Sequence, residues 1–368
     1  MAEPSVPSEE AQELFVEVPS SSGEAGPKIQ LFMRVWGNRD TGIPVLFVHG
    51  GPGNPVETYQ KVNKDFFDYN KFYVVEVDQR GTGKSQPSVA DLENGVANMK
   101  LYLDISMPQM SNDFEIVRKE LAIEKWLVFG GSWGSTLALD YATRFPDRCL
   151  GLIIRGIFLG TKPEHDAVYA RKTFADQESD IKKFQLKQFD TFFEYANQEV
   201  ERRRSEGGSE EAPLDPDDCE RICRVYESLI LQGDRRAVWL CYAYEENLMA
   251  EAESDLMSYD EIDEASFGMA QTTAFFEMRL FTRLTFEEPP ELVARLGALT
   301  AVKTWVVQGT GDAVCPDNFA RELVAGLQRA EVPHKAYFVE ANHKCSSNNI
   351  KAALQQSVAE FVEGAPLP

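Results

Sequence analysis

The chain has 368 residues, which is long enough for one large hydrophobic core and an inserted subdomain. Hydrophobic residues make up 43% of it and charged residues 26%, as in ordinary globular proteins. The net charge of −22 repels phosphate backbones and anionic lipids, so we expect neither nucleic acid nor a membrane as a partner.

The start of the chain, MAEPSVPSEEAQELF, lacks the basic and apolar regions of a secretory signal, and no stretch is long and apolar enough to span a membrane. We therefore expect a cytoplasmic protein. The six cysteines are scattered and do not resemble a disulfide framework. No histidine lies near Cys219 and Cys223 in the sequence, so no metal site is expected, and no organic cofactor is implied.

Residues 1–28 are rich in Pro, Ser, Gly and Glu, which predicts a mobile lead-in with at most a short strand at Leu14–Val18. From residue 29 apolar, strand-like runs alternate with helical patterns, which predicts a parallel sheet covered by helices on both faces. Strands are expected at Ile29–Trp36, Pro44–His49, Phe72–Asp78, Trp126–Phe129, Leu150–Ile154, Thr304–Gln308 and Lys335–Val339. Helices are expected at Gly134–Arg144, Asn318–Arg329 and Asn349–Val362.

The alternation is interrupted by residues 160–292, which are helical in pattern. We therefore expect a helical cap domain at 160–292, inserted into a catalytic domain formed by residues 29–159 and 293–368. Within the cap, residues 202–218 are polar and rich in Gly and Pro, which predicts a flexible surface loop.

The strongest local signal is the segment Gly130-Gly131-Ser132-Trp133-Gly134, which lies between an apolar strand and a helix. A serine in this context is typical of a nucleophile elbow, whose sharp turn presents the hydroxyl at a helix N-terminus. The segment predicts the α/β-hydrolase fold, with a mostly parallel central sheet and an inserted helical cap, and Ser132 as nucleophile.

A serine hydroxyl needs a general base. The candidates are the four histidines of the chain, His49, His165, His334 and His343. Only His343 follows the last predicted strand, as the chain order of this fold requires. The acid should follow the preceding strand, where Asp312 is placed to accept a hydrogen bond from the ring of His343. Asp317 is the nearby alternative, although it is expected to cap the next helix.

Acyl transfer also needs backbone N–H groups that face the attacked carbonyl. One is expected from Trp133, the residue after the nucleophile, and the other from Gly50 or Gly51 in the segment HGGPG. Glycine at these positions lets the backbone approach the substrate closely.

Four segments are similar to motifs of the proline iminopeptidase family, namely Asp78–Ser85 (DQRGTGKS), Gly130–Leu139 (GGSWGSTLAL), Arg155–Phe158 (RGIF) and Asp312–Pro316 (DAVCP). The resemblance covers residues 30–160 and 295–360 closely and the cap loosely. It implies that cap carboxylates bind the free N-terminal ammonium of a peptide and that aromatic side chains line a pocket for the proline ring. Such carboxylates offer charge-assisted hydrogen bonds to the ammonium.

The family's cap segment A-x-I-E-N-H-Y-F has its counterpart in Ala274–Phe281 (AFFEMRLF), where Met278-Arg279-Leu280 replaces N-H-Y. Glu277 and Phe281 fall on matching positions, so the resemblance assigns substrate binding to them. A second family segment ends in Trp-Glu, for which Tyr244-Glu245 is the nearest equivalent, with Glu246 as competitor. Phe158 is a further candidate for the pocket. Three features depart from the family, namely residues 96–112, the insertion at 202–218, and Arg279, which either weakens ammonium binding or pairs with another acid.

The sequence thus predicts a serine aminopeptidase that releases N-terminal proline from short peptides with a free N-terminus; its oligomeric state stays open. An esterase or amidase acting on a small-molecule ester or amide is the alternative, because the same triad serves both reactions. A ligand-binding protein that has lost turnover is a third interpretation, against which the intact triad argues. A serine in place of aspartate in the elbow argues against epoxide hydrolase or dehalogenase chemistry.

Overall fold

The computed structural model describes residues 11–20, 26–174, 180–206, 211–250 and 253–364. The chain divides into two compact units. Unit 1 comprises Met1–Ser88, Asp104–Leu159 and Glu291–Pro368, and unit 2 comprises Val89–Leu103 and Gly160–Pro290. In the described ranges, no helix combines the length and apolar character needed to cross a membrane.

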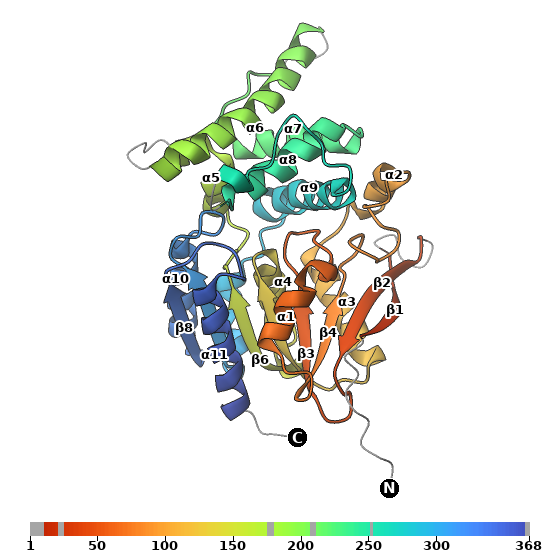
Figure 1. The fold of residues 1–368 in the computed structure, drawn as a ribbon, viewed down its shortest axis with the longest axis vertical. Coiled ribbons are helices and arrows are strands. Elements are labelled where there is room, and N and C mark those ends of the chain that lie inside the picture. Colours follow the sequence, from red (N-terminus) through yellow and green to blue (C-terminus); the bar gives the residue numbers. More distant parts are fainter. Residues whose placement is uncertain (1–10, 21–25, 175–179, 207–210, 251–252, 365–368) are drawn as a thin grey trace. The chain divides into compact units, whose positions relative to one another are not determined.

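Unit 1 is built on a sheet whose described strands follow the order β1-β2-β4-β3-β5-β6-β7-β8 (Figure 1). β2 pairs antiparallel with β1 and with β4, whereas the pairs from β4 to β8 are parallel. The strands are β1 Gln12–Val18, β2 Ile29–Trp36, β3 Ile43–Val48, β4 Phe72–Val77, β5 Trp126–Gly131, β6 Cys149–Arg155, β7 Thr304–Gly309 and β8 His334–Val339. The parallel strands all end at one edge of the sheet, which is where open α/β sheets place their ligand sites.

Helices cover both faces of this sheet (Figure 1). On one face α1 (Gln60–Phe66) and α11 (Asn348–Gly364) contact each other. On the opposite face α3 (Met107–Glu120) contacts α4 (Trp133–Arg144), and α10 (Asp317–Arg329) contacts β7 and β8. Short 3₁₀ segments complete unit 1 at η1 Val56–Tyr59, η3 Pro146–Arg148 and η7 Leu292–Leu299.

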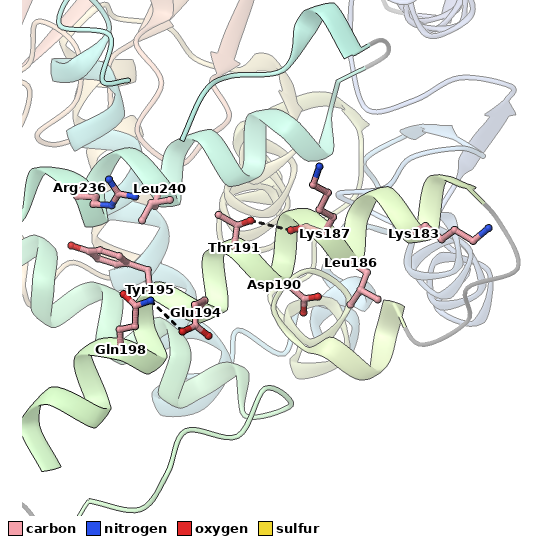
Figure 2. Close-up of a pocket in the computed structure, with 10 residues that line it drawn as sticks. All are labelled: Lys183, Leu186, Lys187, Asp190, Thr191, Glu194, Tyr195, Gln198, Arg236 and Leu240. Atoms are coloured by element: carbon pink, nitrogen blue, oxygen red, sulfur yellow. Dashed lines mark hydrogen bonds between the residues drawn. The ribbon is translucent and has the colours of Figure 1, made fainter. Parts of the chain in front are cut away.

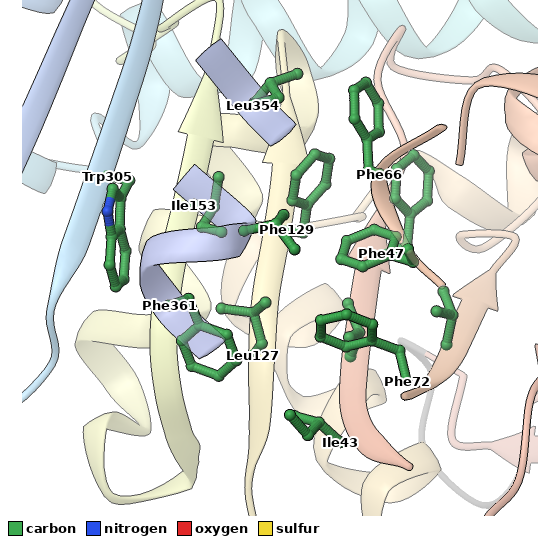
Figure 3. Packing of buried hydrophobic residues seen from close by; sticks show 14 of the residues in the cluster. Ile43, Phe47, Phe66, Phe72, Leu127, Phe129, Ile153, Trp305, Leu354 and Phe361 are labelled. Carbon is green, nitrogen blue, oxygen red and sulfur yellow. The ribbon is translucent and has the colours of Figure 1, made fainter. Parts of the chain in front are cut away.

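The core under α1 and α11 joins strands from both ends of the sheet (Figure 3). Phe47 of β3 and Phe129 of β5 stack with ring centroids 5.8 Å apart, and Phe67 meets Phe129 edge to face. Leu354 and Phe361 of α11 pack into the same cluster. Burying each such side chain contributes about 1.5–3 kcal/mol, so this core holds the strands that carry the site in fixed register.

The regular secondary structure in the described residues of unit 2 is helical. Its elements are α2 Gly95–Met99, η2 Lys100–Tyr102, α5 Lys162–Tyr169, η4 Arg171–Phe174, α6 Asp180–Ser205, α7 Cys219–Leu231, α8 Arg235–Leu248, η5 Glu253–Asp255, α9 Phe267–Thr282 and a π-helical turn η6 Arg283–Glu287. Aromatic rings join the helices: Phe192 of α6 stacks on Tyr226 of α7 at 4.1 Å and on Tyr244 of α8 at 4.6 Å.

The structure confirms the predicted strands and helices to within two residues at each end, and it corrects three expectations. First, β1 pairs with β2 from Gln12 to Val18, so the lead-in is ordered over these residues; residues 1–10 and 21–25 lie outside the described ranges. Second, α6 continues to Ser205, so a helix occupies the start of the expected 202–218 loop, of which residues 207–210 are not described.

Third, residues 89–103 group with the helices of unit 2, whereas we expected them in the catalytic domain. Hydrogen bonds to α9 explain this: the amide of Gln271 donates to the carbonyl of Val89 at 2.6 Å, and Nε of Arg279 donates to that of Leu103 at 2.7 Å. The unusual segment at 96–112 is thus divided, with Asp104 as the first residue that returns to unit 1.

Candidate active site

The turn between β5 and α4 holds Ser132 in a conformation that few residues adopt. Its φ is +57° and its ψ is −131°, and its backbone N–H donates to the carbonyl of Arg155 on the neighbouring strand at 2.9 Å. Such backbone geometry costs about 1–3 kcal/mol and persists only where the surroundings enforce it. The turn packs closely against β3 and needs a glycine at position 134, because a Cβ there would lie 2.3 Å from the carbonyl oxygen of Val48 at the end of β3.

The structure brings Ser132, His343 and Asp312 together from three loops at the same edge of the sheet. Nε2 of His343 lies 3.0 Å from Oγ of Ser132, and Nδ1 lies 2.7 Å from Oδ2 of Asp312. The carbonyl of His343 accepts a hydrogen bond from Nη1 of Arg155 at 3.0 Å, which anchors the histidine loop to β6. Because Asp312 accepts from Nδ1, the neutral imidazole presents its unprotonated Nε2 to the serine.

Asp312 is buried and held by donors on both oxygens. The backbone N–H groups of Val314 and Cys315 donate to Oδ1 at 3.0 and 2.7 Å, and the side chain of Gln308 donates to Oδ2 at 3.3 Å. The alternative acid, Asp317, is the first residue of α10; it does not cap the helix but pairs with Arg321 at 2.7 Å. The carboxylate that can orient the imidazole is therefore that of Asp312.

The HGGPG segment follows β3 and lies against the elbow. A Cβ on Gly50 would be 3.4 Å from Cβ of Ser132 and 3.0 Å from the carbonyl oxygen of Gly131. The N–H of Gly50 donates to the hydroxyl of Tyr59 at 3.2 Å, whereas Trp133 is the first residue of α4. This arrangement sets Gly50 and a helix N-terminus, which favours negative charge, beside the nucleophile.

Comparisons with known proteins identify the family of the chain. A family model for the α/β-hydrolase fold matches residues 43–206. A probable proline iminopeptidase of Leptolyngbya boryana is 30% identical over 87% of this chain and 87% of its own length. A proline iminopeptidase of Arabidopsis thaliana is 31% identical over 85% of this chain and 72% of its own. The chain belongs to the proline iminopeptidase family.

Solved structures agree on the fold of this proline iminopeptidase family member. An acetylester hydrolase of Corynebacterium glutamicum superposes with a TM-score of 0.58 and 17% identity, covering 96% of both chains. At that identity the likeness supports the α/β-hydrolase fold and leaves the substrate to be argued from the site.

The carboxylates that the family resemblance assigns to substrate binding are neighbours within unit 2. Glu277 of α9 is buried, and its Oε2 has no hydrogen-bond partner among the described residues. Burial, and then the carboxyl of Glu245 on α8, raise the pKa of Glu277 well above its ordinary 4.5, with a smaller contribution from Glu246. Glu245 accepts a hydrogen bond from the hydroxyl of Tyr169 on α5. Two acids therefore share a site in which at least one holds its proton.

Arg279 turns away from this pair. Its Nη1 lies 3.1 Å from Glu227, and its Nε donates to the carbonyl of Leu103. Of the two outcomes that the sequence left open, the structure therefore favours pairing with another acid.

Two aromatic candidates lie in different units. Phe281 meets the ring of His165 edge to face at 5.1 Å within unit 2. Phe158 follows β6 in unit 1, where its backbone bonds to the hydroxyls of Ser135 and Thr136.

A groove of about 820 Å³ runs between α6 and α8 of unit 2 (Figure 2). Its walls carry charges of both signs, including Lys187, Asp190 and Arg236, and one aromatic ring, Tyr195. None of the site residues expected from the sequence is among its lining residues, so this groove is separate from the predicted site.

Sequence reasoning missed several residues that contact the predicted ones, Gln308 and Tyr169 among them. Gln308 supports Asp312, and its signal was a glutamine at the end of the otherwise apolar run TWVVQ. Tyr169 donates a hydrogen bond to Glu245. In the sequence, Tyr169 lies four residues after His165, on the same face of a helix that begins with the capping box of Thr161 and Glu164.

Proposed function

We propose that this protein is a serine aminopeptidase that hydrolyses the bond after an N-terminal residue, preferentially proline, in short peptides. The observation that carries the proposal is the continuous row of hydrogen bonds from Ser132 through His343 to Asp312 in a member of the proline iminopeptidase family. The row supplies the nucleophile, base and acid of acyl transfer in one place.

In this mechanism Nε2 of His343 takes the proton of Ser132 as Oγ attacks the peptide carbonyl. The imidazolium that forms is stabilised by Asp312, which already accepts from Nδ1 at 2.7 Å. His343 then gives its proton to the leaving amine, and the C–N bond breaks to leave an acyl-enzyme. A water molecule, deprotonated in turn by His343, releases the N-terminal residue and restores Ser132.

The tetrahedral intermediate needs donors for its oxyanion, and we assign these to the backbone N–H groups of Gly51 and Trp133. Gly50 is the weaker candidate, because its N–H is used by the hydroxyl of Tyr59. Each donor contributes about 3 kcal/mol to transition-state stabilisation in hydrolases of this kind.

We assign recognition of the free N-terminus to Glu277 and Glu245. A buried carboxyl with an oxygen that lacks a partner, beside a second acid, favours a cation that can donate several hydrogen bonds. The ammonium or secondary ammonium of a peptide N-terminus has this chemistry, and an N-acylated peptide does not. Phe281 and Phe158 are our candidates for the contacts of the proline ring.

The test compares a chromogenic proline amide with its N-acetylated form and with a panel of other aminoacyl amides. We expect the free proline amide to be cleaved fastest and the acetylated one to be cleaved at least about 100-fold more slowly, as loss of a buried ionic contact implies. Ser132→Ala serves as the control for contaminating peptidase. Equal rates on free and acetylated amines, with activity still abolished by Ser132→Ala, would assign an esterase or amidase instead.

A further inference from the structure

The side chain of Gln79 bridges the two segments that flank the nucleophile. Gln79 follows β4 and is 3% exposed. Its Nε2 donates to the carbonyl of His49 at 3.0 Å, and its Oε1 accepts from the indole N–H of Trp133 at 2.9 Å. One amide group therefore joins the HGGPG segment to the first residue of α4.

The partners of this amide fix its orientation. An indole N–H can only donate and a backbone carbonyl can only accept, so the side chain must present its oxygen to Trp133 and its nitrogen to His49. The backbone N–H of Gln79 also donates to Nε2 of His49 at 3.0 Å. Nδ1 of His49 must then carry the proton, and it lies 2.9 Å from the carbonyl oxygen of Gly50.

These bonds form a closed and buried network around one loop. His49 is fully buried, and burial lowers its pKa to about 4, so the ring stays neutral in ordinary buffers. The nearest acid in sequence, Asp78, is occupied by the backbone N–H groups of Val56 and Lys84. Arg80 is occupied by Asp113. The two charged neighbours of Gln79 in the chain thus pair with other residues, and the Gln79 amide bonds to His49 and Trp133.

We propose that Gln79 is a positioning residue that sets the spacing between the two oxyanion-hole donors, the N–H groups of Gly51 and Trp133. The inference deepens the proposed function, because it rests on the acyl-transfer site assigned above. Gln79 reaches the first donor through His49, two residues before Gly51, and the second through the indole of Trp133 itself. Preorganised donors act at full strength only when their separation is fixed before the charge develops.

The first test is Gln79→Met, which keeps the length of the side chain and removes both hydrogen bonds. The measurement is the second-order rate at which a fluorophosphonate modifies Ser132, because this reaction places a developing phosphoryl oxyanion in the hole and needs no peptide. We expect the rate to fall by about 10- to 100-fold, as a small misplacement of catalytic groups costs. With a proline amide, kcat should fall by a similar factor and KM should stay nearly constant.

Gln271→Met is the matched control, because Gln271 is also a buried glutamine whose amide donates to a backbone carbonyl, in unit 2. We expect it to lower the unfolding temperature about as much as Gln79→Met does and to leave the phosphonylation rate within about twofold of wild type. Loss of stability and loss of oxyanion stabilisation are thereby separated.

Gln79→Glu decides the question if Gln79→Met does not fold. A protonated glutamic acid can donate to His49 and accept from Trp133 as glutamine does, whereas a carboxylate can only accept. The variant's rate divided by the wild-type rate should therefore rise towards one as the pH is lowered from about 9 to about 6, since burial raises the pKa of a carboxyl. Dividing by the wild-type rate removes every pH dependence that the two proteins share.

Two results would overturn the inference: a Gln79→Met protein that is phosphonylated within about twofold of the wild-type rate, or a Gln79→Glu ratio that does not change with pH. Failure of the proposed function looks different. Wild type would then react with the fluorophosphonate, Gln79→Met would react more slowly, and neither would cleave a proline amide.

Discussion

Two buried carboxyl groups, one in each unit, are held in opposite ways. Asp312 of unit 1 accepts hydrogen bonds from Val314, Cys315 and His343, so its negative charge is matched by the protein itself. Glu277 of unit 2 has an oxygen without a partner among the described residues, and its neighbour Glu245 is another acid. A buried polar atom without a hydrogen-bond partner is costly, so the second site keeps hydrogen-bonding capacity that the first has already used.

The residues of the first site orient one another, whereas the second site has a carboxyl oxygen that a ligand could contact. Hydrogen bonds already join Ser132, His343 and Asp312 in the geometry that electrostatic preorganisation requires. The Glu277–Glu245 pair keeps a proton where we propose that the substrate's ammonium binds. Substitutions at each of the two sites test this difference.

The largest effect is expected from Asp312→Asn. The asparagine keeps the size of the side chain but presents an amide to Nδ1 of His343, which favours the wrong tautomer of the imidazole. We expect kcat to fall by about 10⁴-fold with little change in KM. Asp317→Asn is the matched control, because Asp317 is five residues away and pairs with Arg321. Equal losses in both variants would contradict the assignment of the acid.

The next effect is expected from Glu277→Gln, which removes the ionisable partner of Glu245. We expect KM for a free proline amide to rise by about 10- to 100-fold while kcat changes little, because uniform binding is lost and the triad is untouched. Glu76→Gln is the matched control: Glu76 is a fully buried carboxyl of unit 1 that accepts from Asn63 and Trp36. A drop in kcat with KM unchanged would show that Glu277 supports the chemistry and not the binding.

The same contrast explains how far the sequence could predict this molecule. The triad follows from local signals, since a glycine-flanked serine after an apolar strand can only be a sharp turn, and the chain order then selects Asp312 and His343. The hydrogen bond from Tyr169 to Glu245 joins residues that are 76 positions apart, and the one from Gln271 to Val89 joins residues that are 182 positions apart. Helix-face periodicity does not specify which helices meet, so these contacts and the placement of residues 89–103 required the structure.

A smaller effect concerns the pH dependence of stability. Because the folded protein holds a proton on Glu277 that the unfolded chain releases above 4.5, folding binds a proton and is weakened as the pH rises above that value. The slope is at most about 1.4 kcal/mol per pH unit and ends where the raised pKa of the folded state is passed. Glu277→Gln has no such proton, so wild type should lose stability relative to this variant as the pH rises above about 5 in urea denaturation. Parallel curves would mean that Glu277 is ionised in the folded protein.

The smallest effect on activity is expected from Arg279→Met, although its effect on stability is large. Arg279 pairs with Glu227, which is 8% exposed, so its removal leaves a buried carboxylate and should cost about 3–5 kcal/mol of unfolding free energy. Replacing both partners, as in Arg279→Met with Glu227→Gln, should recover most of that loss in urea denaturation. KM for a proline amide should stay within about threefold of wild type, because the guanidinium is already neutralised by Glu227 and does not compete for Glu277. A tenfold or larger fall in KM would instead mean that Arg279 repels the substrate's ammonium. Arg279 would then act on the Glu277 site as a nearby cation.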